Sequence, residues 1–173
     1  LVFILDERGV DEVDVVGHSL GAQTSLRLAM REPGRVRRLV LEELPPMPRD
    51  QADLDEKIVV GAGFGEQMRG ILAAIRDPRP LLRIDKVLPD AVGAQFTVAD
   101  PQWWARLTDV EVPTLIISGG DRSFLPPRHL RAVVEALPDA QLLTIDTGHS
   151  VHRDKATEFN AAVADFLGIE TGR

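Results

Sequence analysis

The feature that most constrains the fold of this chain is a serine between two glycines, directly after a short strand-like run. Residues 13–16 are rich in valine, which predicts a buried strand. They lead into Gly17-His18-Ser19-Leu20-Gly21, and a helical pattern follows over residues 20–30. A serine on a sharp turn between a strand and a helix needs small neighbours, and the two glycines and Ala22 meet that need. The segment therefore predicts a strand–turn–helix unit with Ser19 at the carboxyl end of its strand.

Three further apolar runs have the length and composition of buried parallel strands. They cover residues 36–41, 113–118 and 141–145. Helical patterns cover residues 128–137 and 156–167, the second ending at Gly168, and the first residues predict a helix that stops at Gly9. Because strands alternate with helices, we predict an α/β fold with a mostly parallel sheet of about four strands, flanked by helices.

Residues 44–112 interrupt this alternation and contain no convincing strand. The segment opens on Pro45-Pro46-Met47-Pro48 and holds a helical pattern near residues 67–75. A structureless loop of this length is improbable in a compact domain. We therefore expect a core of residues 1–43 and 113–173, and a helical cap or lid of residues 44–112 lying over the carboxyl ends of the strands, where open α/β sheets bind ligands.

Composition excludes several classes of function. The formal net charge of −7 argues against a broad nucleic-acid surface. The absence of cysteine excludes disulfides and thiolate metal sites, and fits a reducing compartment. No apolar stretch approaches the ~18 residues of a membrane span. We therefore expect a cytoplasmic protein that acts on a small molecule, with no nucleic-acid or membrane partner, no metal and no cofactor.

A serine hydroxyl is a weak nucleophile unless a base activates it, and the chain offers four histidines. His149 follows the last predicted strand, which places it at the same sheet edge as Ser19. His152, three residues later, is the weaker candidate. His18 adjoins the serine in sequence and should point elsewhere, and His129 falls in a helical pattern between arginines. Each residue also has a purely structural interpretation. Ser19 could serve only to cap the helix that follows it, and His149 could be an ordinary histidine in a loop.

The third member of such a site is a carboxylate that fixes the tautomer of the imidazole. Asp121 follows the strand of residues 113–118 through two glycines, and the chain order Ser19, Asp121, His149 is the one expected for this architecture. A turn aspartate beside glycines is the alternative interpretation. Glu43, at the end of the strand of residues 36–41 and beside Glu42, is the rival acid. We favour Asp121 on chain order alone.

These segments together resemble the α/β-hydrolase superfamily. The resemblance rests on Gly17-His18-Ser19-Leu20-Gly21, on residues 113–121 and on Gly148-His149, and it covers nearly the whole chain. It implies Ser19 as nucleophile, His149 as base and Asp121 as acid, with the N–H of Leu20 in the oxyanion hole. Some relatives carry the acid after the preceding strand, which corresponds to Glu43 here. The spacing of Asp121 after its strand is also one residue tighter than is usual in the family.

The sharp turn that carries Ser19 is called the nucleophile elbow in this family. The resemblance also implies further strands before this elbow, and a loop among them that supplies a second N–H group to the oxyanion hole. Residues 1–12 cannot form that loop, so we expect a fragment of a longer enzyme. Without those strands the elbow strand is a sheet edge, which invites pairing with a second chain. We therefore expect dimerisation or aggregation through residues 13–16.

The activity implied is that of a serine hydrolase acting on an ester, lactone or related acyl substrate. Alternatives are carbon–carbon bond hydrolysis, perhydrolysis or acyl transfer on the same triad, or a truncated remnant with impaired catalysis. Relatives with epoxide hydrolase or haloalkane dehalogenase chemistry use an aspartate as nucleophile, and Ser19 at that position argues against such chemistry here. Candidate substrate-binding residues, for each of which ordinary packing is the alternative, are His18, Phe64, Met68, Phe96, Trp103 and Trp104.

Overall fold

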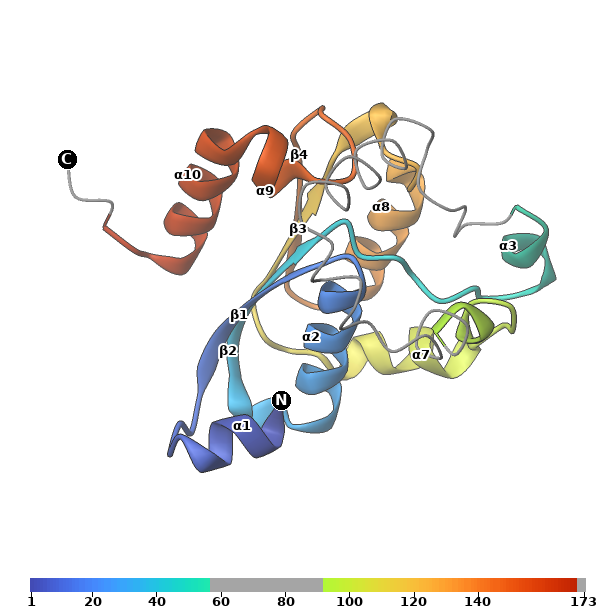
Figure 1. The fold of residues 1–173 in the computed structure, drawn as a ribbon. Helices are drawn as coiled ribbons and strands as arrows, with labels where there is room; N and C mark the ends of the chain where they lie inside the picture. Colours follow the sequence, from blue (N-terminus) through green and yellow to red (C-terminus); the bar gives the residue numbers. More distant parts are fainter. Residues whose placement is uncertain (57–91, 171–173) are drawn as a thin grey trace, which may run out of the picture. The chain divides into compact units, whose positions relative to one another are not determined.

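The computed structural model describes residues 1–56 and 92–170, and its centre is a four-stranded parallel sheet in the order β1-β2-β3-β4 (Figure 1). The strands are β1 Val13–His18, β2 Val36–Glu42, β3 Thr114–Ser118 and β4 Ala140–Thr144. Val16 pairs with Val40, and Ile117 pairs with both Glu42 and Leu143. Each predicted strand is found within two residues of its predicted bounds, so the predicted α/β fold is confirmed.

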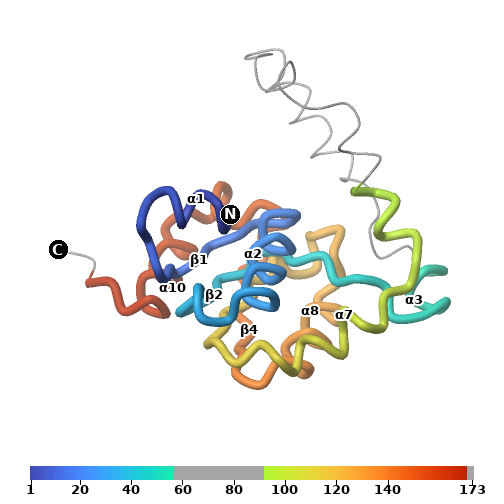
Figure 2. Tube along the Cα trace, turned by 90° about the horizontal axis from the view of Figure 1, so that it is seen from below, coloured from blue at the N-terminus to red at the C-terminus, as the bar shows by residue number. Residues whose placement is uncertain are grey.

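Helices cover both faces of this sheet. They are α2 Leu20–Arg31, α8 Pro127–Ala136, the short α9 Val151–Asp154 and α10 Ala156–Leu167, with 3₁₀ turns η1 Pro33–Arg35 and η3 Gly120–Arg122. The short helix α1 Val2–Glu7 precedes β1 and has no buried residue. Helix α2 packs on β1 and β2, and α8 packs on β3 and β4. Helix α10 lies on the opposite side of the sheet, as both views show (Figures 1 and 2). It ends at Gly168, whose left-handed φ of 63° is the predicted helix stop.

Alternation along the strands explains the two-sided core. Leu115 and Ile117 on β3 point to the α10 face, where they cluster with Val40 and Phe159. Ile116, which lies between them in sequence, is fully buried on the other face. Strands buried on both faces read as continuous apolar runs, and this is why the sequence revealed them.

The chain divides into two compact units. One comprises residues 1–46 and 102–173 and holds the whole sheet, and the other comprises residues 47–101. The second unit contains α3 Gln51–Asp55, which Asp50 caps by accepting a 3.1 Å hydrogen bond from the backbone N–H of Asp53. The helical pattern near residues 67–75, with Phe64 and Met68, lies outside the described residues. The short helix α7 Pro101–Ala105 and the 3₁₀ turn η2 Arg106–Asp109 then lead back to β3.

Among the described residues, no helix has the length and apolar character needed to cross a membrane.

An ion pair between β1 and β2 makes stability depend on pH. Arg37 Nε donates a 2.9 Å hydrogen bond to Asp14 Oδ1, and Nη2 donates to Oδ2. This contact lowers the pKa of Asp14 below its ordinary 3.8. The ionised carboxylate therefore stabilises the folded chain above pH 3.8, and that contribution is lost as the pH falls through the folded-state pKa. We expect Asp14→Asn to lose less unfolding free energy than the wild type when urea denaturation is compared at pH 7 and pH 3. Equal losses would contradict this.

Strand β1 is an edge of the sheet in the described part of the chain, as expected from the sequence. Val16 on this strand is 47% exposed. Because an edge strand offers unpaired N–H and C=O groups beside exposed apolar side chains, we propose that two chains pair through β1. Light scattering should show dimers or larger species, and Val16→Lys should shift them toward monomer. A monodisperse wild-type monomer would contradict the proposal.

Candidate active site

Ser19 occupies the strained turn between β1 and α2. Its backbone is left-handed, with φ 54° and ψ −118°, a conformation that few non-glycine residues adopt. A Cβ at Gly17 would lie 2.6 Å from both Gly21 O and Ser25 Oγ, so only glycine fits at this position, two residues before the serine. A Cβ at Gly21 would meet nothing within 4 Å, so the expected need for a small residue is seen at Gly17 and not at Gly21.

His149 lies in the loop between β4 and α9 and joins the serine to a carboxylate. Its Nε2 is 3.0 Å from Ser19 Oγ, and its Nδ1 is 3.1 Å from Glu43 Oε2. The ring is also packed against Phe124, with ring centroids 4.3 Å apart. Serine, imidazole and carboxylate thus stand in one hydrogen-bonded line, the arrangement in which a nucleophile, its base and the group that orients the base work together.

Glu43 is the carboxylate in this line, and its side chain is completely buried. It follows β2 directly, in a left-handed turn with φ 50°. Besides His149, two donors satisfy its oxygens: the backbone N–H of Gly119 at 2.6 Å from Oε1, and the hydroxyl of Ser123, which donates to Oε2. Three donors on a buried carboxylate hold it in one orientation.

Glycines let the loop that carries His149 approach the end of β3. A Cβ on Gly119 would lie 2.0 Å from the carbonyl oxygen of Gly148, so this contact is possible only without a side chain. The Gly119 carbonyl accepts hydrogen bonds from the N–H groups of Thr147 and Gly148, at 3.0 and 2.9 Å. Gly119 thus links both partners of the line, because its N–H reaches Glu43 and its carbonyl holds the residues before His149.

Asp121, the acid favoured from chain order, does not hold this position. It is exposed in η3 and lines a pocket of about 260 Å³ whose walls include Arg131, Thr144 and Asp146 but not Ser19 or His149. The physical reason is the tight turn after β3, where Gly120 has φ 72° and packs against Asp146. The carboxylate found at His149 Nδ1 is that of Glu43, the rival acid. The tight spacing before Asp121 was the signal in the sequence that favoured Glu43.

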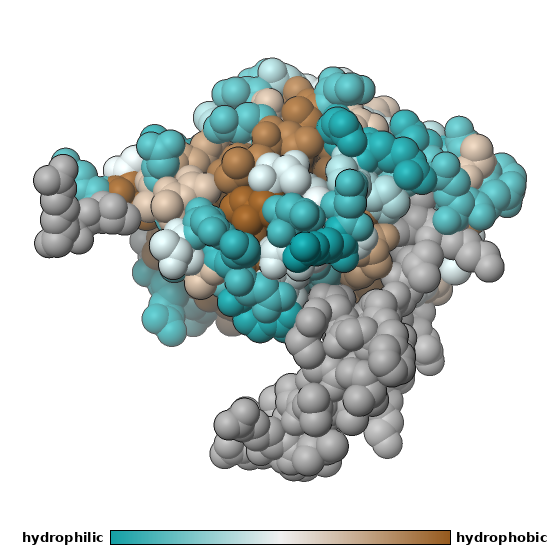
Figure 3. Space-filling model, turned by 90° about the horizontal axis from the view of Figure 1, so that it is seen from above, coloured by the Kyte–Doolittle hydropathy of each residue, from teal (hydrophilic) through white to brown (hydrophobic). Residues whose placement is uncertain are grey.

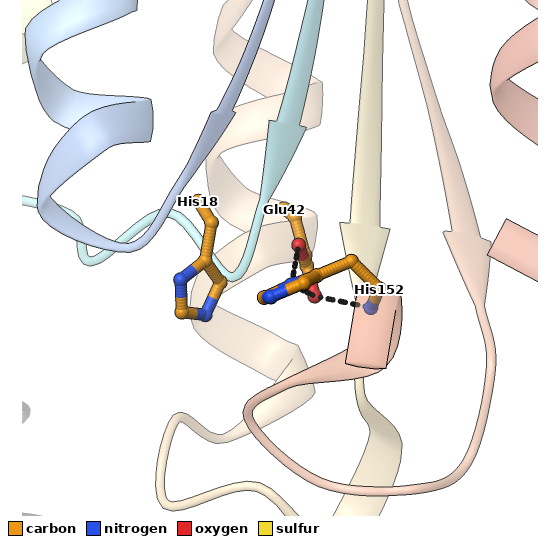
Figure 4. A group of neighbouring side chains, drawn as sticks. All are labelled: His18, Glu42 and His152. Atoms are coloured by element: carbon orange, nitrogen blue, oxygen red, sulfur yellow. Dashed lines mark hydrogen bonds and ion pairs between the residues drawn. The ribbon is translucent and has the colours of Figure 1, made fainter. Parts of the chain in front are cut away.

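A second group of polar side chains lies beside the first. His18 at the end of β1, Glu42 at the end of β2 and His152 in α9 point toward one another (Figure 4). Glu42 is 1% exposed and accepts hydrogen bonds from the His152 backbone N–H at 2.9 Å and from His152 Nδ1 at 2.7 Å. The sequence had suggested that one of the two adjacent carboxylates, Glu42 or Glu43, could reach the catalytic histidine, but it did not predict the contact of Glu42 with His152. Two adjacent carboxylates at the end of a buried strand were the available signal.

His18 connects the two groups. Its Nε2 donates a 2.8 Å hydrogen bond to the carbonyl of His149, and its ring lies between those of His149 and His152, with centroids 4.7 and 4.9 Å away. Burial lowers the pKa of His18 below its ordinary 6.5, since a buried imidazolium loses hydration. The sequence predicted that this side chain points away from the nucleophile, and the structure places its ring against the backbone carbonyl and the ring of His149. Its role in substrate binding stays a prediction.

The remaining predicted residues lie as follows. Leu20 is the first residue of α2, so its N–H belongs to the unpaired N-terminal donors of that helix. Trp103 is buried and its ring packs edge-on against Trp104, at 5.2 Å between centroids. Their contribution to a substrate pocket stays a prediction.

Figure 3 views the molecule from the side of the strands' carboxyl ends and shows apolar surface among polar side chains.

Comparison with known proteins identifies the family. The model of the alpha/beta hydrolase family matches residues 2–162. The chain is 27% identical over 188 residues to a 2-hydroxy-6-oxononadienedioate/2-hydroxy-6-oxononatrienedioate hydrolase of Cupriavidus pinatubonensis, with 95% of this chain and 65% of the relative covered. It is 26% identical over 195 residues to the sn-1-specific diacylglycerol lipase of Mus musculus, with 95% and 62% covered. The chain thus spans a little less than two thirds of each of these relatives.

A solved structure agrees on the fold. The meta-cleavage product hydrolase of Pseudomonas fluorescens IP01 superposes with a TM-score of 0.68 at 20% identity, over 96% of this chain and 68% of that one. Together with the family match over most of its length, this shows that the chain belongs to the α/β hydrolase family.

Proposed function

We propose that this chain carries the catalytic triad of a serine hydrolase, with Ser19 as nucleophile, His149 as general base and Glu43 as the acid that orients it. The observation that supports the proposal is the continuous line from Ser19 Oγ through His149 to the buried Glu43. The relatives support hydrolysis as the reaction, since they are named as hydrolases and as a lipase.

The proposed hydrolysis proceeds through an acyl-enzyme. His149 Nε2 accepts the proton of the Ser19 hydroxyl as Oγ attacks the carbonyl carbon of the substrate. Glu43 accepts the hydrogen bond of Nδ1–H, which fixes the tautomer and stabilises the imidazolium. The imidazolium then gives its proton to the leaving group, and the acyl group stays on Ser19. His149 then takes a proton from a water molecule as that water attacks the carbonyl carbon of the acyl-enzyme. The bond between this carbon and Ser19 Oγ breaks, the imidazolium returns its proton to Oγ, and the acid is released.

The negative charge that develops on the substrate oxygen needs donors. Leu20, the residue after the nucleophile, offers its backbone N–H, and the N-terminus of the 12-residue helix α2 adds its positive dipole end. Each oxyanion donor contributes about 3 kcal/mol to transition-state stabilisation.

The proposed substrate class is an ester, lactone or related acyl compound. The names of the relatives cover a dienedioate hydrolase, a diacylglycerol lipase and a carbamate hydrolase, which have hydrolysis in common and not a substrate. A small activated ester is therefore the suitable first probe, because it tests the triad with little demand on the pocket.

Turnover of a p-nitrophenyl ester by the wild type and by Ser19→Ala tests the proposal. We expect the wild type to hydrolyse the ester and the variant to fall to the background rate, a loss on the order of 10⁴-fold or more. A Ser25→Ala variant, which leaves the triad intact, is the matched control. Equal rates for the wild type and Ser19→Ala would contradict the proposal.

A further inference from the structure

We propose that His18, Glu42 and His152 form a binding site for a divalent transition-metal ion of the zinc class. Each of the three offers a ligand atom, and these atoms all lie within 4.8 Å of one another. The sequence alone predicted no metal, because it contains no cysteine and no close cluster of histidines. The fold assigns His149 to Ser19 and brings His18 to His152 instead.

The donor set favours this class of ion. Two imidazoles and a carboxylate suit Zn²⁺ and its neighbours, whereas Mg²⁺ and Ca²⁺ prefer sites built from oxygen alone. In a filled tetrahedral zinc site the ligand atoms are ~3.3 Å apart. The three ligand atoms here lie within 4.8 Å of one another, so small side-chain rotations would bring them to that distance. Three protein ligands also leave a fourth position for water.

The electrostatics of the end of β2 favour a cation. Glu42 and Glu43 are consecutive, and both side chains are buried. In the described part of the chain, the partners of the Glu42 carboxylate are the backbone N–H and the imidazole of His152. A divalent ion bound here would place its positive charge beside the two buried carboxylates.

The site is open to solvent on one side. The side chain of His152 is 45% exposed, and the Glu42 carboxylate lies behind it (Figure 4). An ion can therefore enter past His152 without opening the sheet. An ion that takes Nε2 of His18 replaces its hydrogen bond to the His149 carbonyl, and the ring proton moves to Nδ1. Because that hydrogen bond is made by the backbone carbonyl of His149, the metal site does not require the imidazole of His149.

Titration of the metal-free chain with Zn²⁺, in competition with a chromophoric chelator, tests the site. We expect one equivalent to bind to the wild type, and the affinity to fall by at least about 10-fold in His152→Ala and in Glu42→Gln. The matched controls are His149→Ala and Ser19→Ala, which should bind Zn²⁺ as the wild type does. The controls separate this site from the proposed serine chemistry, because the binding does not depend on Ser19.

Co²⁺ gives a second readout. The wild type loaded with Co²⁺ should show the visible absorption of an ion held by nitrogen and oxygen ligands, and His152→Ala should not. Because His152 is substantially exposed, its truncation should leave the fold intact, which circular dichroism would verify. The proposal is overturned if the wild type binds no stoichiometric Zn²⁺, if His152→Ala binds it equally well, or if His149→Ala loses it to the same extent.

Discussion

Replacing Glu43 with glutamine is expected to lower kcat for ester hydrolysis by roughly 10³–10⁴-fold. The amide keeps the size of the side chain but removes the negative charge that accepts the Nδ1–H of His149. The NH₂ group of glutamine would favour the other tautomer of the imidazole, in which Nε2 carries the proton. Nε2 cannot then accept the proton of the serine hydroxyl. Initial rates with a p-nitrophenyl ester at saturating concentration measure the effect.

Asp121→Asn is the matched control for this prediction. Asp121 was the acid favoured by chain order, but it is exposed and lines a pocket without Ser19 or His149. We expect Asp121→Asn to leave kcat unchanged. A larger loss for Asp121→Asn than for Glu43→Gln would return the role of acid to Asp121 and contradict the assignment made from the structure.

The second large effect is on stability and concerns Gly119. A Cβ at this position would lie 2.0 Å from the carbonyl oxygen of Gly148, and the clash is with backbone that cannot rotate away. We therefore expect Gly119→Ala to reduce the free energy of unfolding by about 2–4 kcal/mol, measured by urea denaturation followed by circular dichroism. Hydrolysis should fall as well, because the displaced loop carries His149.

Gly34→Ala is the control for a general effect of removing glycine. A Cβ there would meet nothing within 4 Å. We expect this variant to unfold with a free energy within about 1 kcal/mol of the wild type. A Gly119→Ala chain as stable as Gly34→Ala would show that the close approach of Gly119 and Gly148 does not hold the site together.

Much of the fold could be predicted from the sequence because the two central strands, β2 and β3, are buried on both faces. Continuous apolar runs such as residues 36–41 have few other structures open to them, and Gly168 ends its helix for a reason that is visible in the sequence. The turn that carries Ser19 could be predicted as well, because a serine on a strained turn requires a glycine two residues earlier, at Gly17.

The choice of acid could not be settled in the same way. Asp121 and Glu43 both follow strands at the same sheet edge. Chain order had favoured Asp121, although Glu43 also lies between Ser19 and His149 in the sequence. The two acids differ in the conformation of the turn that carries each of them. The turn at Gly120, with its positive φ, leaves Asp121 exposed, whereas the turn at Glu43 places its carboxylate at His149 Nδ1. The side-chain group of His18, Glu42 and His152 escaped prediction for a similar reason, since its members come from three separate elements.

The measurement that tests the central claim most directly is labelling with a fluorophosphonate probe, followed by mapping of the adduct by mass spectrometry. The assignment of Ser19, His149 and Glu43 as a triad predicts an adduct on Ser19 in the wild type, a much slower reaction in His149→Ala and Glu43→Gln, and an unchanged rate in Asp121→Asn. A folded wild-type chain that is not labelled on Ser19, or one labelled equally fast after loss of His149, would contradict it.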